Sequence, residues 1–368
     1  MADQTTPAEA AKAKDARIFR PDDVLYIADL ARKGESCALV GIGSSGKSRL
    51  LQSLLEPDVR EFAFGANWRQ YLPVYVDGNG LLEDSAWGLY EEMIDSTIQM
   101  IEGSDAPNAK DALRELHTEH TRLIDGDPRL AYRWLTHATR MLFRVMGLKC
   151  VLYMLDDIDD LLRKDRLDAR LFRQLKSLRD HHKYRLCYTV ASRRTIDDLA
   201  GERLNEIDSF YKLLKANTRP LGLYELEDAF DMLSGLMKRL NFELPRRIQT
   251  LLIYASGRHP GLLRAVFFAL EESRGWDQFT DEQAVTRAIK QTLYNDPAVQ
   301  EECYQIWDGL SEVERVALAR MAAGHRPTDV QPLRSLRDKG LLNERDSGGY
   351  EIFSPVFADF VRRTTEAA

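Results

Sequence analysis

The sequence predicts an α/β fold in which a parallel sheet domain is followed by a helical domain and a small winged-helix domain. Short apolar runs alternate with amphipathic helical patterns in the N-terminal part, and this alternation predicts parallel strands with helices on both faces. The strand signal stops near Tyr224, where helical spacing takes over. The segment that starts at about residue 296 has a third pattern, in which helices are followed by a hairpin and a last helix.

The length of 368 residues suits two or three domains. Residues 1–17 are rich in Ala, Asp, Lys and Thr, and we expect a disordered tail there. Residues 18–222 carry the sheet pattern, residues 223–295 the helical pattern and residues 296–368 the hairpin pattern. We expect one domain for each of these three segments.

The composition narrows the classes of function. The net charge is −7 and the pI about 5.7, so the chain has no general attraction to nucleic acid or to anionic lipid. Four scattered cysteines lack the spacing of a metal site, and this predicts a reduced, cytoplasmic protein. No run approaches the length of a membrane span.

In the sheet domain, short apolar runs mark the strands and longer amphipathic runs mark the helices. The run 150–155 is continuously apolar, which is typical of a central parallel strand. Residues 103–127 are polar and charged, and we expect a variable excursion there. The expected strands are 37–40, 72–77, 150–155 and 186–191, with a last strand within 210–214, and the expected helices include 22–33, 89–101, 128–147 and 171–179.

Local signals define the helical domain. Apolar residues at helical spacing mark a helix over 229–240, Pro245 starts the next helix, and Gly257 ends it. A third helix begins near Pro260, and a capping box at Thr280 and Gln283 starts a fourth. No strand-like run interrupts these patterns, so an all-helical domain is predicted.

The C-terminal segment has its own order of signals. Ser311 with Glu314 forms a capping box for one helix, and Thr328 with Gln331 starts another. Residues 341–353 read as a hairpin, and the pair at 354–355, Ser-Pro, begins a last helix. Helices followed by a two-stranded wing and a last helix together predict a winged helix.

Residues 41–48 read Gly-Ile-Gly-Ser-Ser-Gly-Lys-Ser between a strand-like run and a helix-like run. The glycines allow positive φ angles and close approach of the backbone to phosphate, and the backbone N–H groups point at the anion. The lysine should reach the β and γ phosphates and the serine after it should bind Mg²⁺. The alternative is an ordinary glycine turn. The expected nucleotide contacts are Gly41, Gly43, Ser44, Ser45, Gly46, Lys47, Ser48 and Arg49.

A second element follows the buried run 150–155. Asp156 lies at the C-terminal end of a strand that we expect beside the P-loop strand, where it would hold the metal together with Ser48. Asp157 would orient or activate the attacking water. The alternative is a helix N-terminus that favours acids, because Asp159 and Asp160 also fit that role.

Arginines follow the next strand. Arg193 lies just after the run 186–191 and could touch the γ-phosphate, whereas the alternative is a solvated arginine pair. Arg203 lies just beyond and could contact a neighbour's nucleotide as an arginine finger, although a surface arginine is the simpler interpretation. Residues 257–261, Gly-Arg-His-Pro-Gly, could present a rigid apolar edge to a base or form an ordinary helix–helix turn.

These motifs, in this order and with a C-terminal winged helix, resemble the STAND class of P-loop ATPases, the signal-transduction relatives of AAA+ proteins. The resemblance implies slow ATP hydrolysis with Mg²⁺, a closed ADP state, and ATP-driven opening with self-association. It also implies that Pro260 packs near the adenine, that Arg193 is the sensor and that Asp157 is the catalytic acid. By the same analogy, residues 18–20 would line the base, and a protein partner would bind through the winged helix or lid.

The chain departs from the STAND pattern because it has no sensor repeats, no recognisable effector domain and no Met-His-Asp element in the winged helix. A DNA-binding ATPase that resembles archaeal origin-recognition proteins is one alternative, and a scaffold that hardly hydrolyses nucleotide is another. The candidate recognition helix and wing hold 4 basic and 5 acidic residues, which disfavours DNA. The complete set of motif residues disfavours the inert scaffold.

Overall fold

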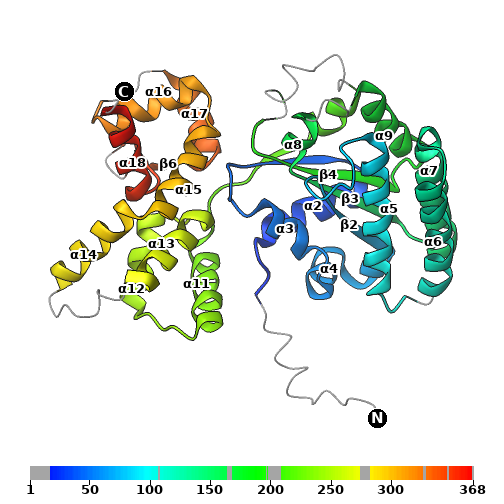
Figure 1. Ribbon diagram of the computed structural model, residues 1–368, viewed down its shortest axis with the longest axis horizontal. Helices are drawn as coiled ribbons and strands as arrows, with labels where there is room; N and C mark the ends of the chain where they lie inside the picture. Colours follow the sequence, from blue (N-terminus) through cyan, green and yellow to red (C-terminus); the bar gives the residue numbers. More distant parts are fainter. Residues whose placement is uncertain are drawn as a thin grey trace, which may run out of the picture.

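The computed structural model describes residues 17–106, 108–163, 168–195, 197, 209–273, 282–325, 329–345 and 348–366. Figure 1 shows a sheet lobe, in which helices cover a central sheet, and a second lobe built mainly of helices. Among the described residues, no helix combines the length and the apolar character needed to cross a bilayer. The four cysteines are buried and unpaired.

The central sheet has five parallel strands in the order β2-β3-β4-β1-β5. Every residue of β1, β3 and β4 is buried, because the sheet is covered on both faces. The strands are β1 Cys37–Val40, β2 Tyr71–Asp77, β3 Cys150–Asp156, β4 Leu186–Ser192 and β5 Thr218–Pro220.

Two expectations about the strands are wrong. β3 does not lie beside the P-loop strand, because β4 pairs with β1 on one side and with β3 on the other. The expected strand within 210–214 is also wrong, since residues 209–215 are helical and β5 follows them. Phe210, Tyr211 and Leu214 share one helical face, and this face packs into the core of the sheet.

Two hydrophobic clusters cover the two faces of the sheet. One holds side chains of α2, α3 and α4, and the other holds those of α5, α6, α7 and α9. The polar excursion expected at 103–127 is wrong as well: α6 packs against α5 and α7 and buries Ala112, Leu116 and Leu123 on one face. The helices are α2 Pro21–Lys33, α3 Lys47–Ser53, α4 Pro57–Phe64, α5 Ala86–Glu102, α6 Ala109–Asp125, α7 Ala131–Met146, α8 Ile158–Arg163 and α9 Ala169–His181, with 3₁₀ turns at Gly65–Gln70 and Pro128–Leu130.

The second lobe begins with the predicted succession of helices. They are α11 Leu226–Leu240, α12 Arg246–Ser256, α13 Pro260–Ser273 and α14 Glu282–Asn295. We call this group the lid. The predicted capping residue Thr280 lies outside the described residues.

The C-terminal part has the order of elements that the sequence predicts. The Ser311–Glu314 capping box is present, whereas α17 is capped by Asp329 and Thr328 lies outside the described residues. One continuous hydrophobic cluster joins this part to the lid, so the two share a core. The elements are α15 Pro297–Asp308, α16 Glu312–Ala322, α17 Val330–Asp338, the antiparallel hairpin β6 Leu342–Glu344 and β7 Tyr350–Ile352, and α18 Pro355–Glu366.

Candidate functional site

The P-loop connects the end of β1 to the start of α3, as the sequence predicts. Of its three glycines only Gly46 has a positive φ, 91°, and Ser44 has the other positive φ of the loop, 51°. A side chain at position 46 would also strike Tyr224, because an added Cβ would lie 2.8 Å from its Cε1. Around Gly43 an added Cβ would meet nothing within 4 Å, so this side of the loop is open to a ligand.

Lys47 is folded back onto its own loop. Its Nζ donates to the carbonyls of Gly41 and Ile42, at 2.8 Å each. Burial lowers the pKa of Lys47 to about 8, and the carboxylates of Asp159, Asp156 and Asp157 oppose this shift, in that order. The ammonium therefore lies among carboxylates at the edge of the sheet, where it could exchange its carbonyl partners for phosphate oxygens.

Asp156 ends β3 as a buried carboxylate whose two oxygens are both engaged. Oδ1 accepts the backbone N–H of Asp157 at 3.0 Å, and Oδ2 accepts the Tyr75 hydroxyl at 2.7 Å. Ser48 supplies a hydroxyl in the first turn of α3. Carboxylate and hydroxyl oxygens are the hard donors that Mg²⁺ prefers, so this donor set fits the ion, directly or through water. Tyr75 was not predicted from sequence.

Asp157 and Arg193 meet at the ends of two adjacent strands. Asp157 has a left-handed backbone, with φ 48°, and Arg193 Nη2 lies 3.4 Å from its Oδ1. The other carboxylate oxygen accepts the Asn79 side-chain amide at 2.9 Å. Asn79 follows β2, and its place at the carboxyl end of a parallel strand is the signal by which it could have been found.

Asp159 has a larger role than the acidic helix start that the sequence suggested. Its buried carboxylate accepts the backbone N–H of Arg193 at 2.7 Å and that of Arg194 at 3.3 Å. Arg194 Nε also lies 3.7 Å from the same carboxylate. Asp159 therefore fixes the segment after β4 to the start of α8. Arg203 lies outside the described residues.

The lid contacts the tip of the P-loop through residues 257–261. The His259 ring lies 2.9 Å from the carbonyl oxygen of Gly43, and an added Cβ at Gly261 would lie 2.6 Å from the Cβ of Ser44. Glu302, on α15, lies against Gly261 as well, and burial raises the pKa of its carboxyl group. Pro260 is buried at the first position of α13.

An aromatic and cationic wall adjoins the loop on the N-terminal side. The Arg49 guanidinium lies 4.4 Å from the ring centroid of Phe19, whose ring meets Tyr224 edge to face at 5.2 Å. Arg20 Nη2 donates to the carbonyls of Ser45, at 3.2 Å, and Gly222, at 2.6 Å. The segment before the first strand is thus in contact with the P-loop.

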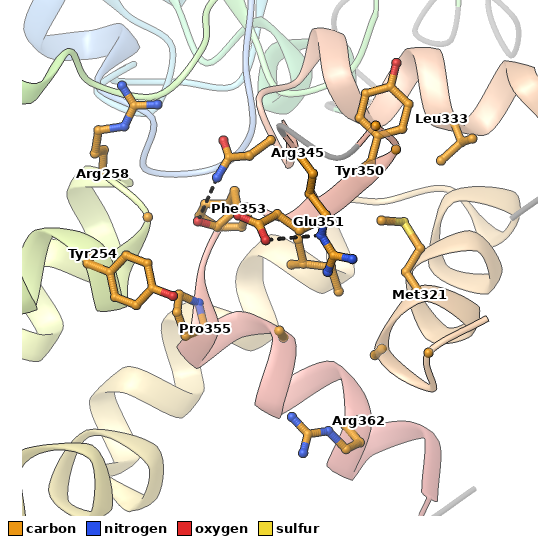
Figure 2. A pocket seen from close by; sticks show the side chains of 18 of the residues that line it. Tyr254, Arg258, Met321, Leu333, Arg345, Tyr350, Glu351, Phe353, Pro355 and Arg362 are labelled. Carbon is orange, nitrogen blue, oxygen red and sulfur yellow. Dashed lines mark hydrogen bonds and ion pairs between the residues drawn. The ribbon is translucent and has the colours of Figure 1, made fainter. Parts of the chain in front are cut away.

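Two large cavities differ in their relation to the P-loop. One, of about 1180 Å³, is lined by Gly43 and Ser44, by Arg193 and by residues of α16 and α17. The other, of about 870 Å³, lies between α12, α16 and the hairpin and has no P-loop residue in its lining. Figure 2 shows Tyr254 and Arg258 on one side of it and Tyr350 and Met321 across from them. The P-loop therefore adjoins the first cavity.

A separate group of possible metal ligands lies on α5 and α6. The ligand atoms of Glu91, Asp95 and His120 lie within 4.8 Å of one another. His120 Nε2 is already paired with Glu91 at 2.7 Å, which accounts for the proximity as an ion pair or hydrogen bond between two helices. We assign no metal to this group.

The sequence matches no protein-family model and no curated protein. Several solved structures resemble this chain over most of its length. A Walker-type ATPase of Pyrococcus abyssi is 18% identical over 94% of this chain and 96% of its own length, with a TM-score of 0.51. The ORC2 protein of Aeropyrum pernix in its ADP form is 14% identical over 95% of this chain and 94% of its own, with a TM-score of 0.52. The chain therefore has the fold of the Walker-type P-loop ATPases.

Proposed function

We propose that this chain is an ATP-binding and ATP-hydrolysing switch of the STAND or AAA+ kind, whose nucleotide state controls its conformation and its association with itself or a partner. The observation that carries the proposal is a double contact of one loop. The P-loop holds Lys47 among the carboxylates of the sheet edge, while its tip lies against His259 and Gly261 of the lid. A change in the loop on phosphate binding would therefore change its contacts with the second lobe.

Each proposed role follows from position and chemistry. The P-loop amides and Lys47 would bind the phosphates, and Ser48 and Asp156 would hold Mg²⁺, which when bound neutralises charge on the phosphate oxygens. Asp157 would accept the proton of the attacking water, and Arg193, 3.4 Å from it, would sense the γ-phosphate. The remaining proposed contacts of the loop are Gly41, Gly43, Ser44, Ser45, Gly46 and Arg49.

The base would lie beside the aromatic wall. Phe19 and Tyr224 supply aromatic surface, Arg49 supplies a cation that can stack, and Pro260 supplies a rigid apolar residue. The preference for adenine over guanine rests on the resemblance to STAND proteins. Slow turnover is proposed on the same ground, because a switch must remain in each state long enough to be read.

The switch is tested by the mass of the full chain in solution, measured by light scattering with ADP, with a non-hydrolysable ATP analogue and without nucleotide. We expect a larger species with the analogue, and we expect Lys47→Ala to abolish the difference because it removes the phosphate contact. Identical monomers in all three conditions for the unmodified chain would count against the switch.

A DNA-binding ATPase is the second candidate, and the likeness of the fold to the ORC2 structure favours it. The charges of the candidate recognition helix oppose it. Arg334 and Arg337 both lie near Asp338, at 4.0 and 3.6 Å, and Arg345 pairs with Glu351 at 3.3 Å. A shift of duplex DNA at near-physiological salt, weakening as salt rises, would place this candidate first.

A further inference from the structure

His259 lies where the lid meets the tip of the P-loop. Its side chain is fully buried, and it is separated from Gly43 by 216 residues of sequence. Nε2 lies 2.9 Å from the Gly43 carbonyl oxygen, and Nδ1 lies 3.2 Å from the backbone nitrogen of Leu262. Both ring nitrogens are therefore engaged, one with the loop and one with the first turn of α13.

These two contacts fix the protonation of the ring. The Leu262 N–H donates to Nδ1, so Nδ1 carries no proton. The proton of the neutral imidazole is on Nε2, which donates it to the Gly43 carbonyl. His259 thus caps α13 with one nitrogen and holds the orientation of a P-loop carbonyl with the other.

The orientation of that carbonyl sets the direction of the next amide. In a trans peptide the C=O of one residue and the N–H of the next point to opposite sides of the plane, and the structure holds no cis peptide among its described residues. Because the Gly43 carbonyl points at His259, the Ser44 N–H points away from the lid. Within the described ranges this N–H makes no hydrogen bond to another protein group.

A free amide on that side is what an anion requires. P-loops bind phosphate through successive backbone N–H groups, and a rotated peptide would present a carbonyl oxygen to the anion instead. Ser44 already has an unfavourable positive φ, 51°, so the loop conformation needs support from outside the loop. The His259 ring provides a fixed donor for this purpose.

We propose that His259 is a positioning residue for phosphate: it holds the Gly43–Ser44 peptide so that the Ser44 N–H faces a bound nucleoside diphosphate, and it thereby links lid closure to phosphate affinity. The proposal rests on the proposed nucleotide site. Gly261 supports it, because an added Cβ there would lie 2.6 Å from the Ser44 Cβ and 2.0 Å from Glu302 Oε1. The lid therefore packs closely against the loop at Ser44.

The test compares two substitutions in the full-length protein. His259→Asn keeps an acceptor near Nδ1 for the Leu262 N–H but is too short to donate to Gly43. His259→Gln keeps a donor within reach of Gly43. Titration calorimetry with ADP and with AMP, both with Mg²⁺, gives the dissociation constant for AMP divided by that for ADP. This ratio isolates the contribution of the β-phosphate to binding.

We expect His259→Asn to lower that ratio about tenfold, the equivalent of about 1.4 kcal/mol, and His259→Gln to restore most of it. Thermal unfolding of both variants should stay within a few degrees of the unmodified protein. A ratio unchanged in His259→Asn would overturn the proposal. An equal loss of affinity for ADP and for AMP, together with a lower melting temperature, would also overturn the proposal. That result would assign His259 a structural role alone.

Failure of the proposed function is separately visible in the same experiment. An unmodified protein that binds neither ADP nor AMP would refute the nucleotide site and the role of His259 with it. An unmodified protein that binds ADP more tightly than AMP, with all three ratios equal, would refute only the role of His259.

Discussion

The Asp159 carboxylate accepts the backbone N–H of Arg193 at 2.7 Å, and this bond joins the C-terminal ends of β3 and β4. A third residue, Asp159, therefore helps to hold Arg193 beside Asp157. Since Asp159 is buried and also accepts the N–H of Arg194, the link is formed by charge-assisted hydrogen bonds in a region from which water is largely excluded.

Replacement of the Asp159 carboxylate should lower stability and hydrolysis more than it lowers ADP affinity. We expect Asp159→Ala to reduce the free energy of unfolding by about 2 kcal/mol, because two amides lose a charged acceptor. Hydrolysis should fall further than ADP affinity, because Asp159→Ala displaces Arg193, whereas Lys47 loses only one of the three carboxylates that favour its charge. Denaturant unfolding and steady-state ATP hydrolysis measure the two effects. Asp111→Ala, at an exposed position on α6, is the control.

Tyr75 offers a test of the proposed metal site. Its hydroxyl donates to Asp156 at 2.7 Å, so Tyr75→Phe removes an orienting bond and keeps the ring. We expect about a tenfold rise in the Mg²⁺ concentration that supports half-maximal hydrolysis, as for other partners of metal ligands. ADP binding measured without Mg²⁺ should be unchanged. An unaltered Mg²⁺ requirement would argue against Asp156 as a ligand.

Lys47 predicts a pH dependence of nucleotide affinity. Burial lowers its pKa to about 8, and a bound phosphate would raise it, so binding above that pH must take up a proton. ADP affinity should therefore fall by up to about tenfold per pH unit above pH 8. Titrations in buffers of different ionisation enthalpy report the proton uptake. Lys47→Arg, which keeps its charge, should flatten the profile, and a flat profile for the unmodified protein would contradict the prediction.

His259 predicts a loss of stability in acid. Burial lowers its pKa from 6.5 to about 4, and the nearby Lys47 charge acts in the same direction. The unfolded chain therefore takes up the proton first, so the stability is present above pH 6.5 and is lost as the pH falls towards 4. The cost reaches about 3 kcal/mol. Denaturant unfolding of the unmodified protein and of His259→Gln should diverge in this window, and parallel curves would exclude the assignment.

The parts of the fold that depend on local sequence were predictable. The P-loop, its flanking strand and helix and the acidic end of β3 follow from short-range signals, and so does the Ser311–Glu314 capping box. The order of the strands was not, because the insertion of β4 between β1 and β3 depends on pairing between distant segments. A strand was expected within residues 210–214 because a short apolar run fits either period.

In the candidate site, too, some residues were predictable from sequence and others were not. Lys47, Asp156 and Arg193 are identified by their place after a strand, but their partners are not. Tyr75 lies 81 residues from Asp156, and His259 lies 216 residues from Gly43, so no sequence spacing relates them. Helix α6 was missed because its buried face holds only a few apolar residues among many charges.

The central claim is that the loop at 41–48 and the acids after β3 form one ATP-hydrolysing site. The most direct measurement is phosphate release from Mg²⁺-ATP by the purified full-length chain and by Lys47→Ala and Asp157→Asn. The account predicts slow release that falls about a hundredfold or more in either variant, with ADP still bound by Asp157→Asn. Release that is the same in all three proteins, or absent from the unmodified chain, would contradict it.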